Sequence, residues 1–222
     1  MTSKIDIINF LIKKYNFKRY LEIGVRYSAD CFDQIDCFHK ISVDPDFENQ
    51  QMKWDAKLQK NFKIDYKYTS DDFFSRLENN LLDLPVNFKW DIVFIDGLHL
   101  SFQVERDILN SLNHLSENGI IVVHDCDPFL YEDNYTRLIE DFWGQQWNGT
   151  VWKTIYKLKA TRSNLKICTL PLDHGIGIIK RGEQNLIPFD NPYFEYRIFQ
   201  KNRIRDLNII DESEFINWLN DE

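Results

Sequence analysis

The chain has 222 residues, 43% of them hydrophobic, which is enough for one α/β domain with a sizeable core. Its formal net charge of −8 argues against a general basic surface that would bind nucleic acid. The longest apolar stretches have the length of a strand, too short to span a membrane, so we expect a cytoplasmic protein whose partners include neither nucleic acid nor membrane.

The first third of the chain alternates between helical and strand-like patterns. In chain order, the predicted segments are a helix over 3–15, a strand over 20–25, a short helix through Cys37, a strand over 40–44, a polar helical stretch up to Lys60 and a strand over 62–68. This order is typical of βαβ units, in which parallel strands are joined by helices.

The middle of the chain repeats the alternation. Thr69, followed by acidic residues, is typical of a helix N-terminus, and we expect that helix to end before Pro85. The continuous apolar run over 90–95 predicts a buried strand. The next helix is expected to end at a glycine C-cap, Asn118-Gly119, directly before another buried strand.

Beyond residue 125 the pattern changes. We expect a helical region broken near 144–150, followed by two runs, 165–170 and 175–180, that form an antiparallel hairpin at the edge of the sheet. The whole pattern predicts an α/β fold with a Rossmann-like, doubly wound, mostly parallel sheet and helices on both faces.

The chain shows neither repeats nor a flexible linker, so we expect one domain. The predicted domain covers 1–182 and opens with the helix contained in 1–17. Residues 183–222 form a predicted helical extension that packs on this domain.

Polar side chains follow two of the predicted strands. Asp96 and His99 come after one buried strand, and His124 and Asp125 end the next. Because the carboxyl ends of parallel strands face the ligand crevice, we expect all four at one edge of the sheet. The two aspartates are suited to a divalent cation; the alternative is that one of them caps a helix and the other binds backbone amides.

The two histidines have different expected roles. His99 has the chemistry of a general base for a hydroxyl proton, with a purely structural role as the alternative. Three roles remain open for His124: a metal ligand, a residue that orients a ligand, or a buried hydrogen-bonding residue. Cys126, at the same rim, is expected to fill space because it has no visible activating partner.

The first two strands end in residues suited to a nucleoside. Gly24 lets the backbone approach a ligand closely, and Asp44 suits the two hydroxyls of a ribose. The Gly-x-Gly-x-x-Gly fingerprint of dinucleotide sites is absent, since Arg26 and Ala29 occupy its later positions. This absence makes NAD or FAD a less favoured ligand. A nucleoside ligand that has no pyrophosphate stays open.

Other chemistry-bearing side chains are given structural roles. We expect reduced thiols at Cys31, Cys37, Cys126 and Cys168. We expect structural histidines at His39, His114 and His174. We expect sheet-packing tryptophans at Trp143, Trp147 and Trp152. We expect a solvated basic face at Lys153, Lys157, Lys159 and Arg162.

The ordered set of motifs resembles the class I S-adenosylmethionine-dependent methyltransferases. It is most similar to the sugar and natural-product O-methyltransferases that have a Phe-Ile-Asp-Gly-x-His strand end and a later His-Asp strand end. The pieces that carry the resemblance are LEIGV at 21–25, SVDP at 42–45, TSDDFF at 69–74, FIDGLH at 94–99, VHDC at 123–126, WNGTVWK at 147–153 and DHGIG at 173–177.

The resemblance implies a sheet of seven strands with the last one inserted antiparallel. It implies a cofactor site in which Glu22 and Gly24 line the methionine side, Asp44 holds the ribose, Ser70 and Asp71 lie by the adenine, and Asp96 contributes at the next strand end. In metal-dependent relatives, residues matching Asp96 and Asp125 ligate magnesium and a histidine matching His99 is the base; His124 completes our predicted metal set.

These observations predict an S-adenosylmethionine-dependent O-methyltransferase, with Mg²⁺ as a possible second cofactor. The expected acceptor is a hydroxyl of a sugar, a glycan precursor or another small polyhydroxylated molecule, and a homo-oligomer is possible. Two alternatives remain at this stage: an NAD-dependent oxidoreductase on a similar sheet, and a non-catalytic nucleoside-binding module.

Overall fold

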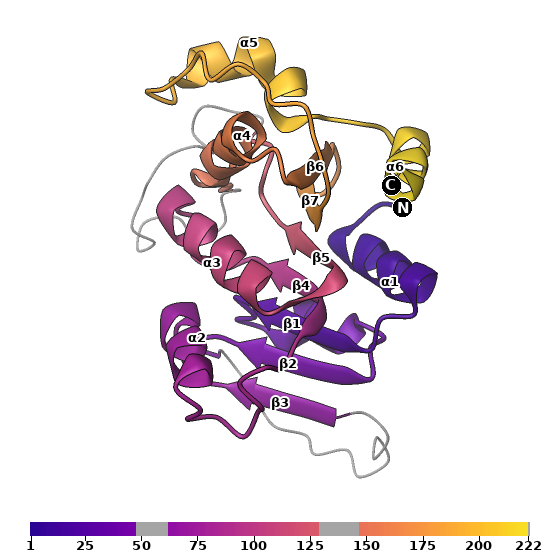
Figure 1. Cartoon of the computed structure of the whole chain (residues 1–222), viewed down its shortest axis with the longest axis vertical. Helices are drawn as coiled ribbons and strands as arrows, with labels where there is room; N and C mark the ends of the chain where they lie inside the picture. Colours follow the sequence, from indigo (N-terminus) through magenta and orange to yellow (C-terminus); the bar gives the residue numbers. More distant parts are fainter. Residues whose placement is uncertain (48–61, 129–146, 222) are drawn as a thin grey trace. The chain divides into compact units, whose positions relative to one another are not determined.

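The computed structural model describes residues 1–47, 62–128 and 147–221. In this part of the chain seven strands form one sheet in the order β3-β2-β1-β4-β5-β7-β6 (Figure 1). The order reverses at β1, as it does in a doubly wound sheet, and the β6-β7 pair is antiparallel. The predicted fold class, a mostly parallel Rossmann-like sheet with an antiparallel edge hairpin, is confirmed.

The strands are β1 (Arg19–Ile23), β2 (His39–Val43), β3 (Phe62–Tyr66), β4 (Trp90–Ile95), β5 (Leu115–Val123), β6 (Leu165–Leu170) and β7 (Ile176–Arg181). The α-helices are α1 (Lys4–Tyr15), α2 (Ser70–Glu78), α3 (Ser101–Asn113), α4 (Val151–Thr161), α5 (Tyr196–Leu207) and α6 (Glu212–Asn220). In place of the short helix predicted through Cys37 there are two single 3₁₀ turns, Ser28–Asp30 and Phe32–Gln34.

The described chain divides into two compact units. The first unit comprises residues 2–97 and 106–121, and the second comprises residue 1, 98–105 and 122–222. Each unit contains one part of the predicted site, so each is described by itself.

In the first unit, β3, β2, β1 and β4 are parallel neighbours in register. Ile23 of β1 is paired with Val43 of β2 on one side and with Ile95 of β4 on the other. The residues that follow these three positions therefore leave the sheet at the same edge. This register brings Gly24, Asp44 and Asp96 to one line.

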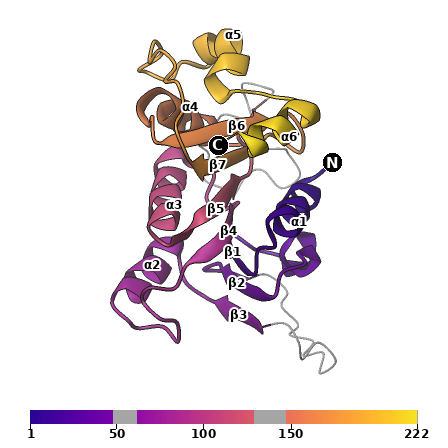
Figure 2. The ribbon, with the colours of Figure 1, turned by 45° about the vertical axis from the view of Figure 1, so that its right-hand side comes forward.

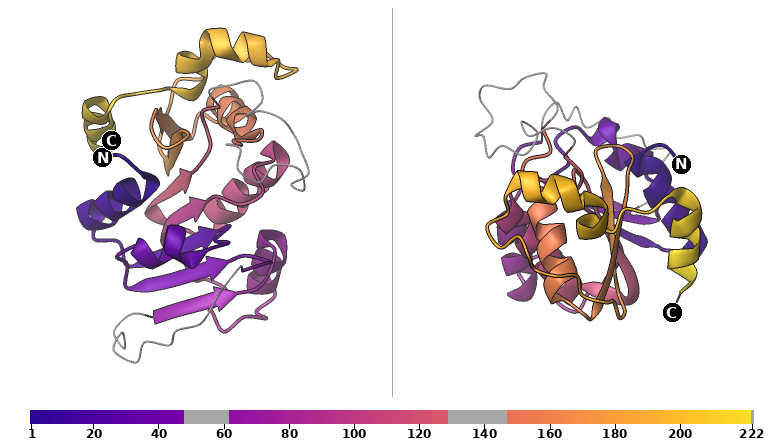
Figure 3. Two further views of the ribbon diagram at one scale, coloured as in Figure 1. Left: turned by 180° about the vertical axis from the view of Figure 1, so that it is seen from behind. Right: turned by 90° about the horizontal axis from the view of Figure 1, so that it is seen from above.

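Helices cover both faces of these four strands, with α1 on one face and α2 on the other (Figures 2 and 3). Ser3 caps the N-terminus of α1 in a reciprocal capping box with Asp6, and Ile7, Ile8 and Leu11 of the helix are fully buried. α2 begins at Thr69, whose hydroxyl accepts a hydrogen bond from the Asp72 backbone, as the sequence predicts.

In the second unit, the C-terminal residues pack on α4 and β6. Trp152 of α4 is fully buried and stacks on Phe199 of α5 with 4.0 Å between ring centroids. Thr169 of β6 forms a parallel bridge with Ile209, so the chain between α5 and α6 extends the hairpin edge. Trp152 is thus a core residue, and its stacking partner belongs to α5 of the C-terminal residues.

The predicted boundary between the α3 helix and the next strand is wrong. α3 ends at Asn113, and the chain has already turned at His114, whose carbonyl accepts a hydrogen bond of 2.8 Å from the Trp90 backbone. Leu115 is buried and opens β5, so Gly119 lies inside the strand rather than at a helix C-cap. The polar run before Gly119 reads as a helix end, but it is the exposed start of a strand.

The prediction of a uniformly solvated basic face on α4 is also wrong. Lys159 is buried and its Nζ lies 3.1 Å from Oε1 of Gln184, while Lys157 pairs with Glu105 at 2.8 Å. α4 lies between β6 and the C-terminal residues. These residues cover part of the helix face that was predicted to be solvated.

Several predictions lie outside the described residues, namely the helical stretch up to Lys60, Trp143 and the helical region before residue 147. The four cysteines are free, as predicted, and all four are buried. Among the helices of the described residues, none has the length and apolar character needed to cross a membrane.

Candidate functional site

Gly24 closes the end of β1 in the first unit. Its φ of +86° lies in the left-handed region, and a Cβ added there would lie 2.2 Å from the carbonyl oxygen of Asp96. The Gly24 backbone donates to the Val43 carbonyl, and the Asp96 backbone donates to the Ile23 carbonyl, both at 2.9 Å. These bonds tie the ends of β1, β2 and β4 together, and only glycine fits at position 24. We call this joined edge the ledge at Gly24.

Asp44 is held rigidly at the end of β2. Its Oδ2 accepts a hydrogen bond of 2.9 Å from the Arg26 backbone, and its Oδ1 accepts one of 2.7 Å from the Asp46 backbone. Each carboxylate oxygen keeps lone pairs for further donors. A buried carboxylate fixed in this way suits a pair of vicinal hydroxyls.

Glu22 of β1 is fully buried beside Tyr20, whose hydroxyl donates to it. Burial raises the pKa of the Glu22 carboxyl to about 8; Asp96 adds to the rise, whereas the Tyr20 hydroxyl and Lys4 oppose it. Glu22 is therefore largely a neutral acid near pH 7, and a cation bound beside it would favour ionisation.

Asp96 carries a partner that the sequence does not reveal. Lys4 Nζ of α1 lies 2.7 Å from Asp96 Oδ2, with both side chains mostly buried, and 5.6 Å from the Phe94 ring centroid. A lysine in the first turn of a helix is an ordinary surface residue by pattern. Only the packing of α1 on β4 reveals that it belongs to this site.

Ser70 and Asp71 both have protein partners in the first unit. The Ser70 hydroxyl donates to Asp107 at 2.6 Å, and both residues are buried. Asp71 pairs with Arg106 at 3.0 Å and is about half exposed. Their predicted place beside an adenine stays a prediction.

In the second unit, both ring nitrogens of His99 face oxygen acceptors. Nε2 lies 3.1 Å from Asp125 Oδ2, and Nδ1 lies 3.0 Å from the carbonyl oxygen of Trp147. The Trp147 ring also stacks on the imidazole with a centroid distance of 5.1 Å. Because carbonyl and carboxylate oxygens accept hydrogen bonds, each ring nitrogen is placed to donate one.

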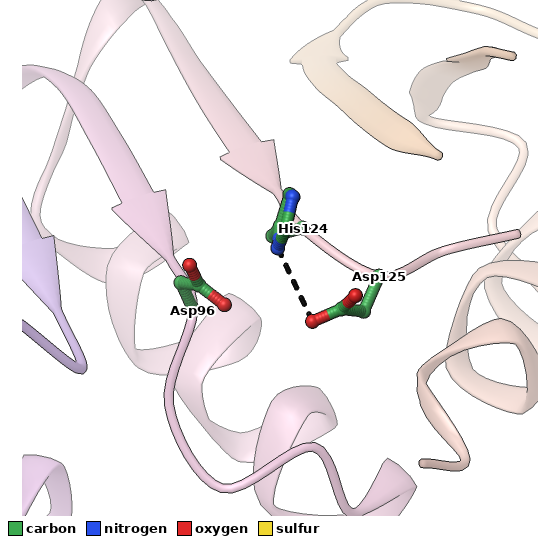
Figure 4. Close-up of side chains that lie close together, drawn as sticks. All are labelled: Asp96, His124 and Asp125. Atoms are coloured by element: carbon green, nitrogen blue, oxygen red, sulfur yellow. Dashed lines mark hydrogen bonds and ion pairs between the residues drawn. The ribbon is translucent and has the colours of Figure 1, made fainter. Parts of the chain in front are cut away.

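Asp125 joins two imidazoles. Its Oδ2 lies 3.2 Å from His124 Nδ1 as well as beside His99, and His124 Nε2 lies 3.5 Å from Asp173 Oδ1. Figure 4 draws the His124–Asp125 bond, together with Asp96 of the first unit. Asp125 has a φ of +59°, a conformation that non-glycine residues seldom adopt. Such an outlier commonly marks a residue whose direction matters.

Cys126 is fully buried, and its thiol donates to the Val123 carbonyl at 3.3 Å. This position agrees with the predicted space-filling role.

Residues 21–126 match the family model described as a methyltransferase domain. The matched segment begins one residue before Glu22 and ends directly after Asp125, so it spans both parts of the site. The match covers 106 of the chain's 222 residues, and it confirms the predicted resemblance to methyltransferases.

Solved methyltransferase structures share the fold. The O-methyltransferase TomG from Streptomyces achromogenes, in complex with SAM, is 14% identical with a TM-score of 0.56, over 79% of this chain and 78% of its own. PaMTH1 from Podospora anserina, bound to SAH, is 17% identical with a TM-score of 0.55, over 82% and 80%. MycE of the mycinamycin pathway, in complex with Mg, SAH and mycinamycin VI, is 16% identical with a TM-score of 0.50, over 89% and 54%. A comparison with curated proteins found no matching sequence.

Within residues 21–126, the predicted residues fall into two groups. In the first unit, β-strand register brings Gly24, Asp44 and Asp96 to one edge, next to buried Glu22. In the second unit, His99, His124 and Asp125 form one hydrogen-bonded group. Sequence reasoning missed Lys4 and Asp173. It predicted that Trp147 packs the sheet, whereas Trp147 contacts the imidazole of His99.

Proposed function

We propose that this protein transfers the methyl group of S-adenosylmethionine to a hydroxyl oxygen of a sugar or another small polyhydroxylated molecule, with a divalent cation assisting. The methyltransferase domain supports the reaction class. Neighbours with O-methyltransferase activity in their names support oxygen as the acceptor atom. The sugar class rests on the resemblance of the two strand ends, Phe94–His99 and Val123–Asp125.

The observation that carries the proposal is the environment of His99. Its Nδ1 faces the Trp147 carbonyl and its Nε2 faces the Asp125 carboxylate. In the proposed reaction Nε2 of the neutral ring exchanges this contact for the acceptor hydroxyl and takes its proton as the oxygen attacks the methyl carbon. The imidazolium that forms donates from Nε2 to Asp125, 3.1 Å away, which stabilises the new charge.

The cofactor side uses residues of the first unit. Asp44, whose two oxygens already accept backbone hydrogen bonds, accepts the ribose hydroxyls. Gly24 leaves the room that a side chain would fill. Glu22 provides a buried carboxyl for the positively charged methionine end. S-adenosylmethionine supplies an activated methyl group and leaves as a neutral thioether.

The donor set of the proposed cation site fits a divalent metal. In the second unit Asp125 provides a carboxylate oxygen and His124 an imidazole nitrogen that is buried beside it, and in the first unit Asp96 provides a carboxylate. Carboxylates suit Mg²⁺, whereas the imidazole also suits Mn²⁺ or Zn²⁺. A bound cation would lower the pKa of the acceptor hydroxyl. Asp96 has to give up its ion pair with Lys4 to take part.

A methyl-transfer assay tests the proposal. The protein is incubated with methyl-labelled S-adenosylmethionine and a panel of monosaccharides, nucleotide sugars and polyhydroxylated natural products, with Mg²⁺, with Mn²⁺ and after chelation. We expect label on an acceptor oxygen, with less turnover after chelation. Transfer to nitrogen or carbon acceptors alone would overturn the assignment to oxygen, and unchanged turnover after chelation would overturn the role of the metal.

A further inference from the structure

We propose that Arg203 of α5 is a positioning residue for Asp125: its ion pair with Asp127 holds the end of β5 in the conformation that directs the Asp125 carboxylate at the His99 and His124 rings. The inference deepens the proposed function, on which its consequence for catalysis rests. Arg203 acts on the reaction through Asp127 and the backbone. All of these residues belong to the second unit.

The backbone around Asp125 has an unusual conformation. Asp125 has a φ of +59°, and the β6–β7 turn that binds the following residues contains three more positive values, at Asp173 (+46°), His174 (+63°) and Gly175 (+88°). A residue with a side chain is strained in this left-handed region and stays there only where its surroundings hold it. Asp125 therefore depends on the contacts that its neighbours in the chain make.

The first set of contacts comes from the β6–β7 turn. The Cys126 backbone donates to the Gly175 carbonyl, and the Asp127 backbone donates to the His174 carbonyl, both at 3.0 Å. A Cβ added at Gly175 would lie 2.3 Å from the Asp127 Cβ, so the turn lies as close to the strand end as glycine permits. The turn thus holds the two residues that follow Asp125.

The second set of contacts comes from α5. Arg203 Nε donates to Oδ1 of Asp127, and Arg203 Nη2 donates to Oδ2. This two-point pairing fixes the direction of the carboxylate as well as its distance. The Tyr196 hydroxyl, at the start of the same helix, donates to the Pro128 carbonyl at 3.3 Å. α5 therefore holds two consecutive residues just beyond Asp125.

Burial makes Asp127 dependent on its partner. Its side chain is 5% exposed, and that of Arg203 is 31% exposed. A buried carboxylate that loses its cationic partner is strongly destabilising, so Asp127 stays where Arg203 can reach it. Arg203 in turn extends from a fixed support, because Phe199 of the same helix stacks on the buried Trp152.

The geometry at Asp125 leaves little room for displacement. Its Oδ2 lies 3.1 Å from His99 Nε2 and 3.2 Å from His124 Nδ1, close to the upper limit of a good hydrogen bond. A shift of about 1 Å at the end of β5 would break both contacts, and a misplacement of this size can cost about 100-fold in rate. The C-terminal residues are therefore a working part of the proposed site.

The test compares the wild type with Arg203→Met, Arg203→Lys and the double variant Asp127→Asn with Arg203→Met. Arg197→Met, at an exposed arginine of the same helix, is the control. Four quantities are measured: the midpoint of urea unfolding, the hydrogen-exchange rates of the backbone amides at 126 and 127, kcat, and the Kd for S-adenosylhomocysteine.

Arg203→Met should lower the urea midpoint, since it leaves the Asp127 carboxylate buried and unpaired. We expect exchange at 126 and 127 to accelerate at least about tenfold and kcat to fall about 10- to 100-fold, with the Kd within about twofold. Arg203→Lys keeps a cation at one oxygen and should lose less in each respect. Arg197→Met should match the wild type.

The double variant separates positioning from mere stabilisation. It contains no unpaired buried charge, so we expect the urea midpoint to recover while exchange stays fast and kcat stays low. Recovery of kcat together with the midpoint would overturn the proposal, as would wild-type exchange rates at 126 and 127. If Arg203→Met does not fold, the double variant decides.

The exchange measurement needs neither S-adenosylmethionine nor an acceptor. A wild type that transfers no methyl group, but whose slow exchange is accelerated in the double variant, would overturn the proposed function alone. Equally efficient methyl transfer by the wild type and the double variant would overturn the role of Arg203 alone.

Discussion

Lys4 Nζ lies 2.7 Å from Asp96 Oδ2. The pair joins the first turn of α1 to the end of β4, directly beside the ledge at Gly24. The carboxylate of Asp96, a proposed cation ligand, is thus neutralised by the ammonium group of Lys4. The ammonium of Lys4 and any incoming cation compete for the same oxygen.

Removal of this competitor should strengthen metal binding. Lys4→Met keeps much of the side-chain volume and leaves Asp96 without its ammonium partner. We expect the Kd for Mn²⁺, measured by calorimetry, to fall roughly two- to tenfold, the range of a modest ion pair. Lys13→Met, on the last turn of the same helix, is the control and should leave the Kd unchanged. Weaker metal binding in Lys4→Met would contradict the competition.

Glu22 should impose a pH dependence on stability. Its carboxyl pKa is about 8 in the folded protein and near the ordinary value of 4.5 in the unfolded chain. Between these values the unfolded chain loses the proton first, so the free energy of unfolding falls as pH rises, by up to about 1.4 kcal/mol per pH unit.

Glu22→Gln removes that titration while keeping an oxygen that the Tyr20 hydroxyl can donate to. Urea unfolding of both proteins between pH 5 and pH 8.5 checks the expectation. The variant should gain stability relative to the wild type as pH rises toward 8. Parallel curves would mean that Glu22 ionises without cost in the folded protein.

His99 should affect catalysis and not cofactor binding. His99→Gln cannot accept the hydroxyl proton, so we expect kcat to fall by about 10²- to 10⁴-fold. Binding of S-adenosylhomocysteine should stay within about twofold, since the cofactor residues lie in the first unit. His39→Gln, at the start of β2, should retain full activity. Normal turnover in His99→Gln would remove His99 as the base.

Asp44 should affect cofactor binding instead. Asp44→Asn keeps the shape of the side chain but replaces a charged acceptor with a neutral amide. Hydrogen bonds to a charged group are worth about 1.5–3 kcal/mol, so we expect the affinity for S-adenosylhomocysteine to fall by roughly 10- to 100-fold. Asp46→Asn, two residues on and exposed, serves as the control. Equal affinities in the two variants would argue against a ribose at Asp44.

The sheet is predictable from the sequence because its evidence is local. Apolar runs such as Trp90–Ile95 form buried strands, and the residue after each run lies at the edge that carries the site. Local evidence also misleads: the polar run before Gly119 predicts a helix end where a strand begins. The error concerns a boundary, so the order of the elements is unaffected.

The rest of the site depends on contacts between residues far apart in the chain. Lys4 meets Asp96 across 92 positions, and Trp147 meets His99 across 48. Neither side chain differs in its sequence pattern from a surface lysine or a core tryptophan. Tertiary packing alone distinguishes them.

Calorimetric titration of the intact protein with S-adenosylhomocysteine, and in parallel with NAD, tests the central claim most directly. The account predicts saturable binding of S-adenosylhomocysteine with one site per chain, weakened by Asp44→Asn, and no binding of NAD. A folded protein that binds NAD, or that binds S-adenosylhomocysteine equally well without the Asp44 carboxylate, would contradict it.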